Sequence, residues 1–324
     1  MKKQILCTLG PSSMNTRVIA RLSDLGVSLF RINLSHTPLD AVEEAIAFIQ
    51  ERTAVPVCLD SEGAQIRTGS FSAGPTTLAE HSIVRVAAGT VAGDAGRFSL
   101  TPGGIARQFR VGDFLSIDFN SVLVQVVGVE DGETLLRVVN GGLVGNNKAV
   151  TLERDVDMPA LSEKDVGAMK IGLAMGVRHF ALSFANRGAD VDAIRALVGP
   201  DSFVISKIEC LSGLRNLADI TLKSDAILID RGDLSRQVPV ERVPAAQKKI
   251  IRTGKALDRK VYVATNFLES MIAQPAPTRA EVNDIYNTFV DGADGLVLAA
   301  ETAIGRHPVE SARVLASLIG AFEQ

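Results

Sequence analysis

The strongest sign of chemistry in this chain is a lysine and a glutamate that stand two positions apart at the end of an apolar run. In Ser206-Lys207-Ile208-Glu209 the two charged side chains fall on the same side of an extended strand. Asp233 follows the next apolar run and adds a second carboxylate. Carboxylate oxygens with open positions for water and phosphate oxygens suit Mg2+ or Mn2+. We therefore predict a divalent metal site at Glu209 and Asp233.

A tight turn and a set of oxygen-bearing side chains accompany that motif. Arg231 and Gly232 follow Asp230 at a strand end, where glycine permits close backbone approach and the turn amides can bind a carboxylate or phosphate. Further oxygen donors end two neighbouring strands. They fit a monovalent-cation cage and equally fit hydrogen-bonded structural groups, and they are Asn33, Ser35, Asp60 and Ser61.

Eight short apolar runs rich in β-branched residues alternate with helical patterns and must position these side chains. Several are almost uninterrupted, which suits parallel strands buried on both faces. Capping boxes at Ser162 and Thr278 predict helix starts. The pattern predicts an α/β fold, a (β/α)8 TIM barrel, with polar strand ends converging at one mouth. The predicted strands are Gln4 to Leu9, Leu29 to Leu34, Val55 to Asp60, His179 to Phe184, Phe203 to Glu209, Ala226 to Asp230, Tyr262 to Thr265 and Gly295 to Leu298.

One stretch departs from this alternation. Residues 70–154 are rich in Val, Gly, Thr and Asp, with short alternating runs and turn signals such as Asp131-Gly132. We predict that they form a small inserted β-barrel domain, while 1–69 and 155–324 form the catalytic barrel. Its place after the third strand makes the insert a candidate lid over the strand ends.

Composition excludes several classes of function. Of the 324 residues 46% are hydrophobic and 22% are charged, with a net charge of -3, which is no nucleic-acid or membrane signature. Three scattered cysteines form neither a disulfide framework nor a zinc site. The first residues lack the apolar region of a signal peptide. We therefore expect a cytoplasmic protein that acts on a small molecule.

Eleven ordered segments resemble successive blocks of the pyruvate kinase family, and the likeness runs from Ile5 to Ala312. They are CTLGPSS, FRINLSH, LDSEGAQIRTG, DMPALSEKD, SFANRGADV, ISKIE, RGDL, VPAAQKKII, VATNFLESM, PAPTRAEVND and AAETAIGRHPVESA. The resemblance implies metal-assisted phosphoryl transfer between phosphoenolpyruvate, or a related enol phosphate, and a nucleoside diphosphate.

The resemblance also implies roles for individual residues. Lys207 stabilises the phosphoryl group in flight, Arg31 anchors phosphate, and Thr265 lies beside the enolate carbon. The implied substrate contacts are Ser183, Asp230, Arg231 and Gly232, and the implied contacts to ADP or ATP are His36, Arg67 and Lys148. The implied K+ ligands are Asn33, Ser35, Asp60 and Ser61. A closed lid would exclude water, which competes as a phosphoryl acceptor.

The chain departs from the family pattern at several places. Asp230 replaces an alanine and Ala300 replaces a serine, whereas Val150 to Arg154 replaces the family's Asn-Leu-Pro-Gly after Lys148. The sequence ends after the eighth barrel helix, so we expect no regulatory carboxyl-terminal domain. Homo-oligomer formation is left as an open alternative. These departures leave two alternatives to a kinase. One is a metal-dependent oxo-acid lyase or aldolase, and the other is a non-catalytic regulatory paralogue.

Overall fold

The chain divides into two compact units. The structure, a computed structural model, describes residues 2–63, 65–118, 121–154 and 156–324. Met1–Gly63 together with Pro159–Gln324 form the barrel unit, and Ala64–Met158 form the inserted unit. The predicted insert, residues 70–154, lies within the bounds of the inserted unit. The function of the insert as a lid stays a prediction.

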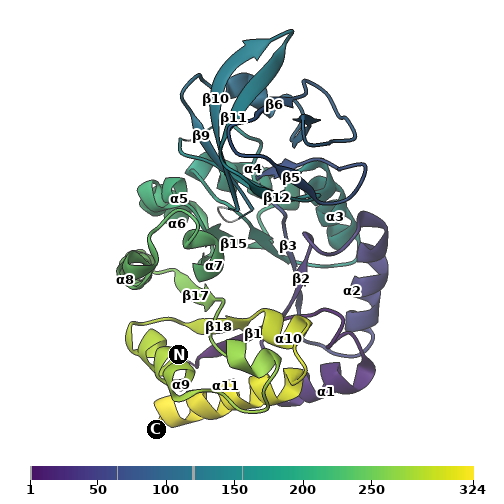
Figure 1. The fold of residues 1–324 in the computed structure, drawn as a ribbon. Coiled ribbons are helices and arrows are strands. Elements are labelled where there is room, and N and C mark those ends of the chain that lie inside the picture. The colour runs from purple at the N-terminus through teal and green to yellow at the C-terminus, as the bar shows by residue number, and fades with distance from the viewer. Residues whose placement is uncertain (1, 64, 119–120, 155) are drawn as a thin grey trace. The chain divides into compact units, whose positions relative to one another are not determined.

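The barrel unit contains eight parallel strands that close on themselves in the order β1-β18-β17-β16-β15-β14-β3-β2 (Figure 1). Each predicted strand is present, so the predicted (β/α)8 barrel is confirmed. The strands are β1 Gln4–Thr8, β2 Leu29–Asn33, β3 Val57–Asp60, β14 His179–Leu182, β15 Phe203–Ile208, β16 Ala226–Asp230, β17 Lys260–Ala264 and β18 Gly295–Leu298.

Two apolar layers hold these strands. One fills the barrel interior and includes Leu6, Cys58 and Leu228, and the other lies between the strands and the helices. Every residue of β16 is buried, as expected for a strand covered on both faces. The register places Asn33 beside Asp60, so that the polar ends of β2 and β3 are neighbours.

Helices alternate with these strands along the chain. The predicted capping boxes are both present, with Ser162 paired with Asp165 and Thr278 paired with Glu281. The helices are α1 Thr16–Asp24, α2 Val42–Gln50, α3 Glu163–Ala174, α4 Gly188–Val198, α5 Leu211–Arg215, α6 Leu217–Lys223, α7 Arg231–Leu234, α8 Val243–Ala256, α9 Arg279–Val290, α10 Ala300–Ala303 and α11 Pro308–Phe322. Short 3-10 turns are η1 Leu39–Ala41, η3 Val240–Arg242 and η4 Glu269–Ile272.

The inserted unit is built from short strands and the 3-10 turn η2 Ile105–Gln108. The β10–β11 hairpin turns at Asp131 and Gly132, whose φ angles of 51° and 78° are those that a tight hairpin needs. The strands are β4 Ile66–Thr68, β5 Thr76–Leu78, β6 Ile83–Val86, β7 Arg97–Phe98, β8 Leu100–Thr101, β9 Phe114–Ile117, β10 Val122–Glu130, β11 Glu133–Asn140, β12 Gly142–Val144 and β13 Ala149–Leu152.

The expected small β-barrel needs one correction. The described strands form an eight-stranded sheet that runs from β7 to β8, together with a two-stranded sheet of β12 and β5. Among the described strands, no ladder of hydrogen bonds pairs β7 with β8, so the sheet is not closed into a barrel. The two are consecutive in the chain, with Ser99 alone between them, so the backbone itself connects the two ends of the sheet.

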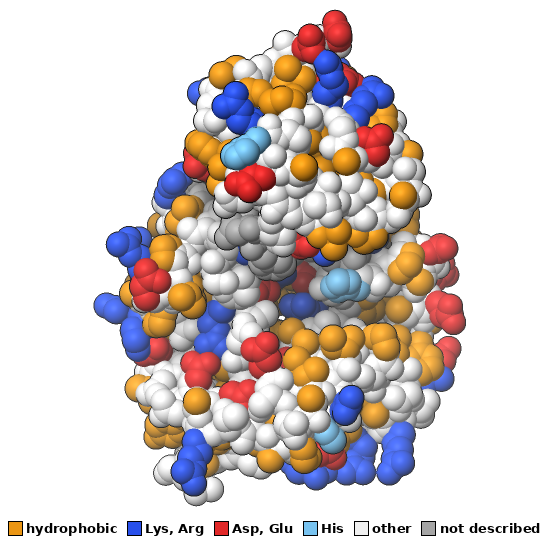
Figure 2. Space-filling view, in the orientation of Figure 1, with side chains coloured by type: hydrophobic (Ala, Val, Ile, Leu, Met, Phe, Trp, Pro, Cys, Tyr) orange, Lys and Arg blue, Asp and Glu red, His pale blue; other side chains and the backbone are white. Residues whose placement is uncertain are grey.

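The surface carries both signs of charge. Figure 2 shows acidic and basic side chains interspersed over the visible face of each unit. In the part of the chain that the structure describes, no helix has the length and hydropathy needed to cross a bilayer.

Candidate active site

Lys207 lies among acidic and hydroxyl groups at the carboxyl end of the barrel. Its side chain comes from β15 and its residue is only 5% exposed, while Glu209, directly after the strand, is 1% exposed. Lys207 Nζ lies 2.8 Å from Glu209 Oε1 and donates to Ser183 Oγ at 2.9 Å and Asp60 Oδ2 at 3.3 Å. Three strands thus deliver partners to a single buried ammonium group.

Lys207 and Glu209 each influence the pKa of the other. Burial alone would lower the pKa of Lys207, but the carboxylates of Asp60 and Glu209 outweigh it and hold that pKa above its ordinary value. Burial raises the pKa of Glu209; Lys207 opposes this, and the nearby charges of Asp233 and Asp230 add to it. Lys207 is therefore a fixed cation, whereas Glu209 favours a positive charge beside it.

Arg31 brings a second buried cation to the same end of the barrel. The residue is 6% exposed, and its Nε lies 3.4 Å from Asp60 Oδ2. Among the described residues, Nε and Nη1 have no hydrogen-bond partner. Unsatisfied buried donors are costly, so these two nitrogen atoms favour an anionic ligand.

Three carboxylates gather next to Lys207. Oxygen atoms of Glu209, Asp230 and Asp233 lie within 4.8 Å of one another. Glu209 Oε2 accepts the N–H of Phe184 at 2.7 Å, and Asp233 Oδ1 lies 2.8 Å from Arg236 Nη2. Three close, poorly solvated carboxylates repel one another unless a cation lies between them, and carboxylate oxygens are ligands that Mg2+ and Mn2+ prefer. The residues present fit a divalent ion.

Asp230 binds the turn that follows it. Its Oδ1 accepts the N–H groups of Gly232 and Asp233 at 3.1 Å and 3.3 Å, and lies 3.2 Å from Thr265 Oγ1. Thr265 Oγ1 in turn accepts the N–H of Gly232 at 2.8 Å and lies 2.6 Å from the carbonyl oxygen of Ala264. Asp230 therefore ties the ends of β16 and β17 to α7, a contact that an alanine could not make.

Thr265 occupies an unusual backbone conformation. Its φ is 71° and that of Asn266 is 59°, a left-handed region that non-glycine residues rarely adopt. Two consecutive residues in this region carry strain, which structures retain mainly at functional sites. The hydrogen bond donated by Gly232 N–H and the one that Thr265 Oγ1 donates to Asp230 hold the Thr265 hydroxyl in place despite that strain.

Arg231, whose role as a substrate contact stays a prediction, makes several contacts within the barrel unit. Its Nε and Nη2 donate to the carbonyl oxygen of Thr265, its Nη1 donates to Asp284, and its guanidinium stacks 4.0 Å from the Phe267 ring centre. These contacts use the side chain to support the loop after β17. No local pattern predicts Asp284 as a partner of Arg231, because the two residues are far apart in the chain.

The oxygen donors assigned to K+ lie close together, but several are already used. Asn33 Oδ1 accepts the N–H of Ser35, and Ser61 Oγ accepts the N–H of Ser183. Both oxygens of Asp60 have partners, since Oδ1 accepts from Ser183 Oγ and Oδ2 faces Arg31 and Lys207. This arrangement matches the structural alternative at least as well as a cation cage.

Comparison with known proteins decides the family. The family model for the pyruvate kinase barrel domain matches residues 1–312. The chain belongs to the pyruvate kinase family. The predicted resemblance is thereby confirmed, and the strand ends described above are those of a pyruvate kinase barrel.

Individual relatives agree along almost the whole chain. The chain is 37% identical to a pyruvate kinase of Mycobacterium intracellulare, covering 99% of this chain and 70% of that protein. It is 36% identical to a pyruvate kinase of Mycobacterium tuberculosis strain H37Rv, with the same coverage of 99% and 70%. For Thermotoga maritima pyruvate kinase the identity is 35%, over 99% of this chain and 71% of that protein. The chain is a pyruvate kinase-like phosphotransferase, and neither the aldolase nor the non-catalytic alternative is favoured.

The family also sets the class of ligand. Pyruvate kinases act on small-molecule substrates and nucleotides and need a divalent metal ion. His36, predicted to contact the nucleotide, is exposed just after β2 in the barrel unit. Arg67 and Lys148 belong to the inserted unit, where Arg67 donates to the carbonyl oxygen of Asn147 and Lys148 pairs with Asp118 at 2.9 Å. The nucleotide roles of these three residues stay predictions.

Two further residues support the site. Arg236 pairs with Asp233 three residues earlier, a helical spacing that could have suggested it. Glu301 is 2% exposed and accepts the N–H groups of Leu268 and Ala299, which fixes the loops after β17 and β18. Neither residue was assigned a function.

Proposed function

We propose that this chain transfers a phosphoryl group between phosphoenolpyruvate, or a related enol phosphate, and a nucleoside diphosphate. One observation carries the proposal. The buried, unpartnered donors of Arg31 lie beside the same Asp60 carboxylate that Lys207 contacts, and Lys207 also contacts the three-carboxylate cluster. A metal-dependent phosphotransferase must bind an anionic substrate next to its metal ligands.

Positive charge is the main contribution of these residues. A loose phosphoryl-transfer state spreads negative charge over the equatorial oxygens and needs positioning rather than a protein nucleophile. Lys207 supplies a fixed ammonium and Arg31 supplies free guanidinium N–H groups. Glu209 and Asp233 would hold Mg2+ or Mn2+, and a bound ion would add positive charge at the substrate oxygens.

Thr265 is proposed to act on the enolate side. The N–H of Gly232 donates to Thr265 Oγ1, which orients the hydroxyl proton toward its acceptors Asp230 and Ala264. The proposed role of this exchangeable proton is to protonate the enolate carbon. Ser183 holds Lys207 through its hydroxyl, so its proposed contact with substrate is shared with a positioning role.

The remaining proposals concern the acceptor and the cations. His36, Arg67 and Lys148 are proposed to contact the phosphates of ADP or ATP, with the inserted unit acting as a lid that excludes water. K+ is proposed at Asn33, Ser35, Asp60 and Ser61. Removing K+ from the assay, with Na+ replacing it at equal ionic strength, tests that assignment.

The decisive experiment measures pyruvate released from phosphoenolpyruvate with ADP or GDP and Mg2+. We expect turnover that chelation abolishes, and a fall of about a hundredfold to a thousandfold in kcat for Lys207→Met. Lys249→Met, which removes an exposed lysine on α8, is the matched control and should keep full activity. Far-UV circular dichroism checks that both variants fold. Undiminished turnover in Lys207→Met, or product formation without any nucleotide, would contradict the proposal.

A further inference from the structure

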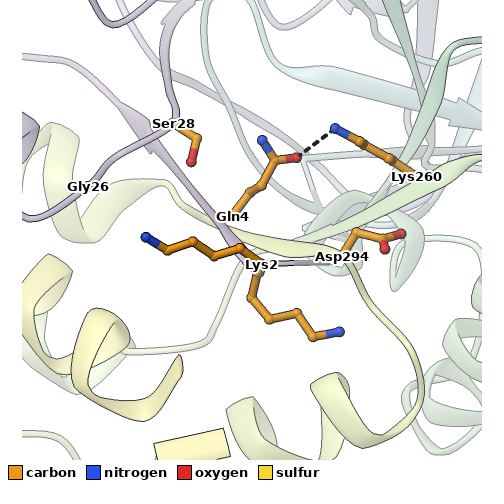
Figure 3. A pocket seen from close by; sticks show the side chains of 7 residues that line it. Lys2, Gln4, Gly26, Ser28, Lys260 and Asp294 are labelled. Carbon is orange, nitrogen blue, oxygen red and sulfur yellow. Dashed lines mark hydrogen bonds between the residues drawn. The ribbon is translucent and has the colours of Figure 1, made fainter. Parts of the chain in front are cut away.

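A pocket of about 270 Å³ lies at the opposite end of the barrel, where the strands begin. Its side chains precede or open β1, β2, β17 and β18, and parallel strands bring these first residues to one end. We call it the amino-end pocket (Figure 3). The residues that matter here are Lys2, Lys3, Gln4, Ser28, Lys260 and Asp294.

Two of the charges in this pocket are already used. Lys3 Nζ donates to the carbonyl oxygen of Ala293 at 2.6 Å and lies 5.5 Å and 5.4 Å from the ring centres of Phe289 and Phe322. Both carboxylate oxygens of Asp294 accept from Lys255, at 2.7 Å and 2.9 Å. Lys2 and Lys260 remain, and within the described ranges neither has a carboxylate at ion-pair distance.

The neutral groups of the pocket also offer donors. Gln4 Oε1 accepts from Tyr262 Oη at 2.8 Å and from Lys260 Nζ at 3.3 Å, the second bond being drawn in Figure 3. Both bonds need the amide oxygen on that side, so the NH2 group of Gln4 is left for another partner. In the described part of the chain, neither this NH2 group nor the Ser28 hydroxyl has a hydrogen-bond partner.

We propose that the amino-end pocket binds a small phosphate anion, either inorganic phosphate or the phosphate group of a small monoester. Two ammonium groups match the charge of a phosphate dianion, and the NH2 and hydroxyl groups match its additional acceptor oxygens. A carboxylate would offer one charge and two oxygens to the same four donors. The pocket volume admits a small molecule but is below the usual range for larger ligands. This site lies apart from the proposed active site and does not depend on its function.

His179 gives an internal reporter of the pocket. It opens β14 and packs 5.5 Å from the Phe203 ring centre. Burial lowers the pKa of His179, and the positive charge of Lys260 lowers it further. An anion that binds beside Lys260 offsets this repulsion, so phosphate in the pocket will raise the pKa of His179.

The experiment follows the His179 ring by NMR during titration with inorganic phosphate, with a small phosphate monoester and with NaCl at equal ionic strength. Calorimetry alone would not serve, because phosphate at Arg31 would also release heat. We expect a saturable increase in the His179 pKa with phosphate and none with NaCl. Comparing the two phosphate probes shows which source binds more tightly.

Three variants make the test specific. Lys260→Gln and the exposed Lys2→Gln should each weaken phosphate binding about tenfold, the effect of losing one charge-assisted hydrogen bond. Lys260→Gln also changes the starting pKa of His179, so Lys2→Gln carries the affinity comparison. Lys249→Gln removes the same charge from α8 and should leave binding unchanged. An unmoved His179 resonance in the wild-type chain, or equal affinity in Lys2→Gln, overturns the proposal.

Discussion

The two ends of the barrel differ in how their charged side chains are stabilised, although the same eight strands form both. At the carboxyl end, Lys207 and Glu209 are almost fully buried, and each is compensated by a neighbour of opposite charge. At the amino end, Lys2 is exposed and Lys260 is half-buried, and neither has a carboxylate partner within the described residues. Buried charges are costly unless paired, whereas exposed charges remain hydrated. Lys2 and Lys260 can therefore stay without a carboxylate partner because water reaches them.

The largest effect is expected at the carboxyl end of the barrel, where a substitution removes one member of a buried charge pair. Glu209→Gln removes a carboxylate from the cluster with Asp230 and Asp233 and one partner of Lys207, so we expect Mn2+ affinity to fall by at least about a hundredfold. Direct Mn2+ binding followed by electron paramagnetic resonance measures this without relying on turnover. Lys260→Gln at the amino end should bind Mn2+ as the wild type does. Equal losses in both variants would show that the two ends are not independent.

Two substitutions of Asp230 separate the contribution of its hydrogen bonds to kcat from that of its charge. Asp230→Ala removes the acceptor for Gly232, Asp233 and Thr265, and we expect kcat to fall about tenfold with a loss of about 1 kcal/mol in stability. Asp230→Asn keeps an acceptor oxygen and drops only the charge. It should recover most of kcat and stability while keeping weaker Mn2+ affinity. If asparagine is as damaging as alanine for kcat, charge rather than positioning explains Asp230.

Metal binding at the carboxyl end should depend on pH through the ionisation of Glu209. Burial, with help from Asp233 and Asp230, raises the pKa of Glu209 above its ordinary value. A proton on Glu209 competes with the metal, so Mn2+ affinity should rise as pH increases and the carboxyl ionises. Titration calorimetry in buffers of different ionisation enthalpy should show proton release that shrinks at high pH. Affinity that stays flat with pH would mean that Glu209 is ionised throughout.

The smallest expected effect is at the amino end. Because the His179 pKa is lowered in the folded state, its contribution to stability is complete above the ordinary pKa of 6.5 and is lost as pH falls below it. Lys260→Gln removes part of that shift, so its melting temperature should decline less steeply between pH 7 and acid than that of the wild type. Differential scanning calorimetry measures both slopes. A steeper decline in the variant would contradict the repulsion between Lys260 and His179.

Much of the barrel could be predicted from the sequence because its strands are buried on both faces. Continuous apolar runs marked all eight strands, and capping boxes marked the starts of α3 and α9. The spacing of Lys207 and Glu209 predicted their shared side, and the structure brings them to 2.8 Å. These features depend on local sequence or on the geometry of parallel strands.

Contacts between distant segments could not be predicted in the same way. Arg231 binds Asp284, and Asp230 binds Thr265, through loops whose path depends on backbone angles that no local pattern specifies. The amino-end pocket joins residues from both ends of the chain, and none of them belongs to a recognisable motif. The insert was recognised by its turns, but the connection of β7 to β8 through Ser99 depends on how its sheet wraps.

That connection has a consequence for association between molecules. The outermost strands of the described sheet, β7 and β8, have two residues each, and Gly69 N–H already binds the Ser99 carbonyl oxygen at 2.8 Å. A foreign strand finds little unpaired backbone there to extend, and long exposed edges are what promote intermolecular β-pairing. A side chain at position 69 would meet Ser99 Oγ at 2.3 Å and the Ser99 carbonyl oxygen at 3.1 Å, so the Ser99 hydroxyl would have to move. Gly69 thus allows the close approach to Ser99 by which the two ends of the sheet meet.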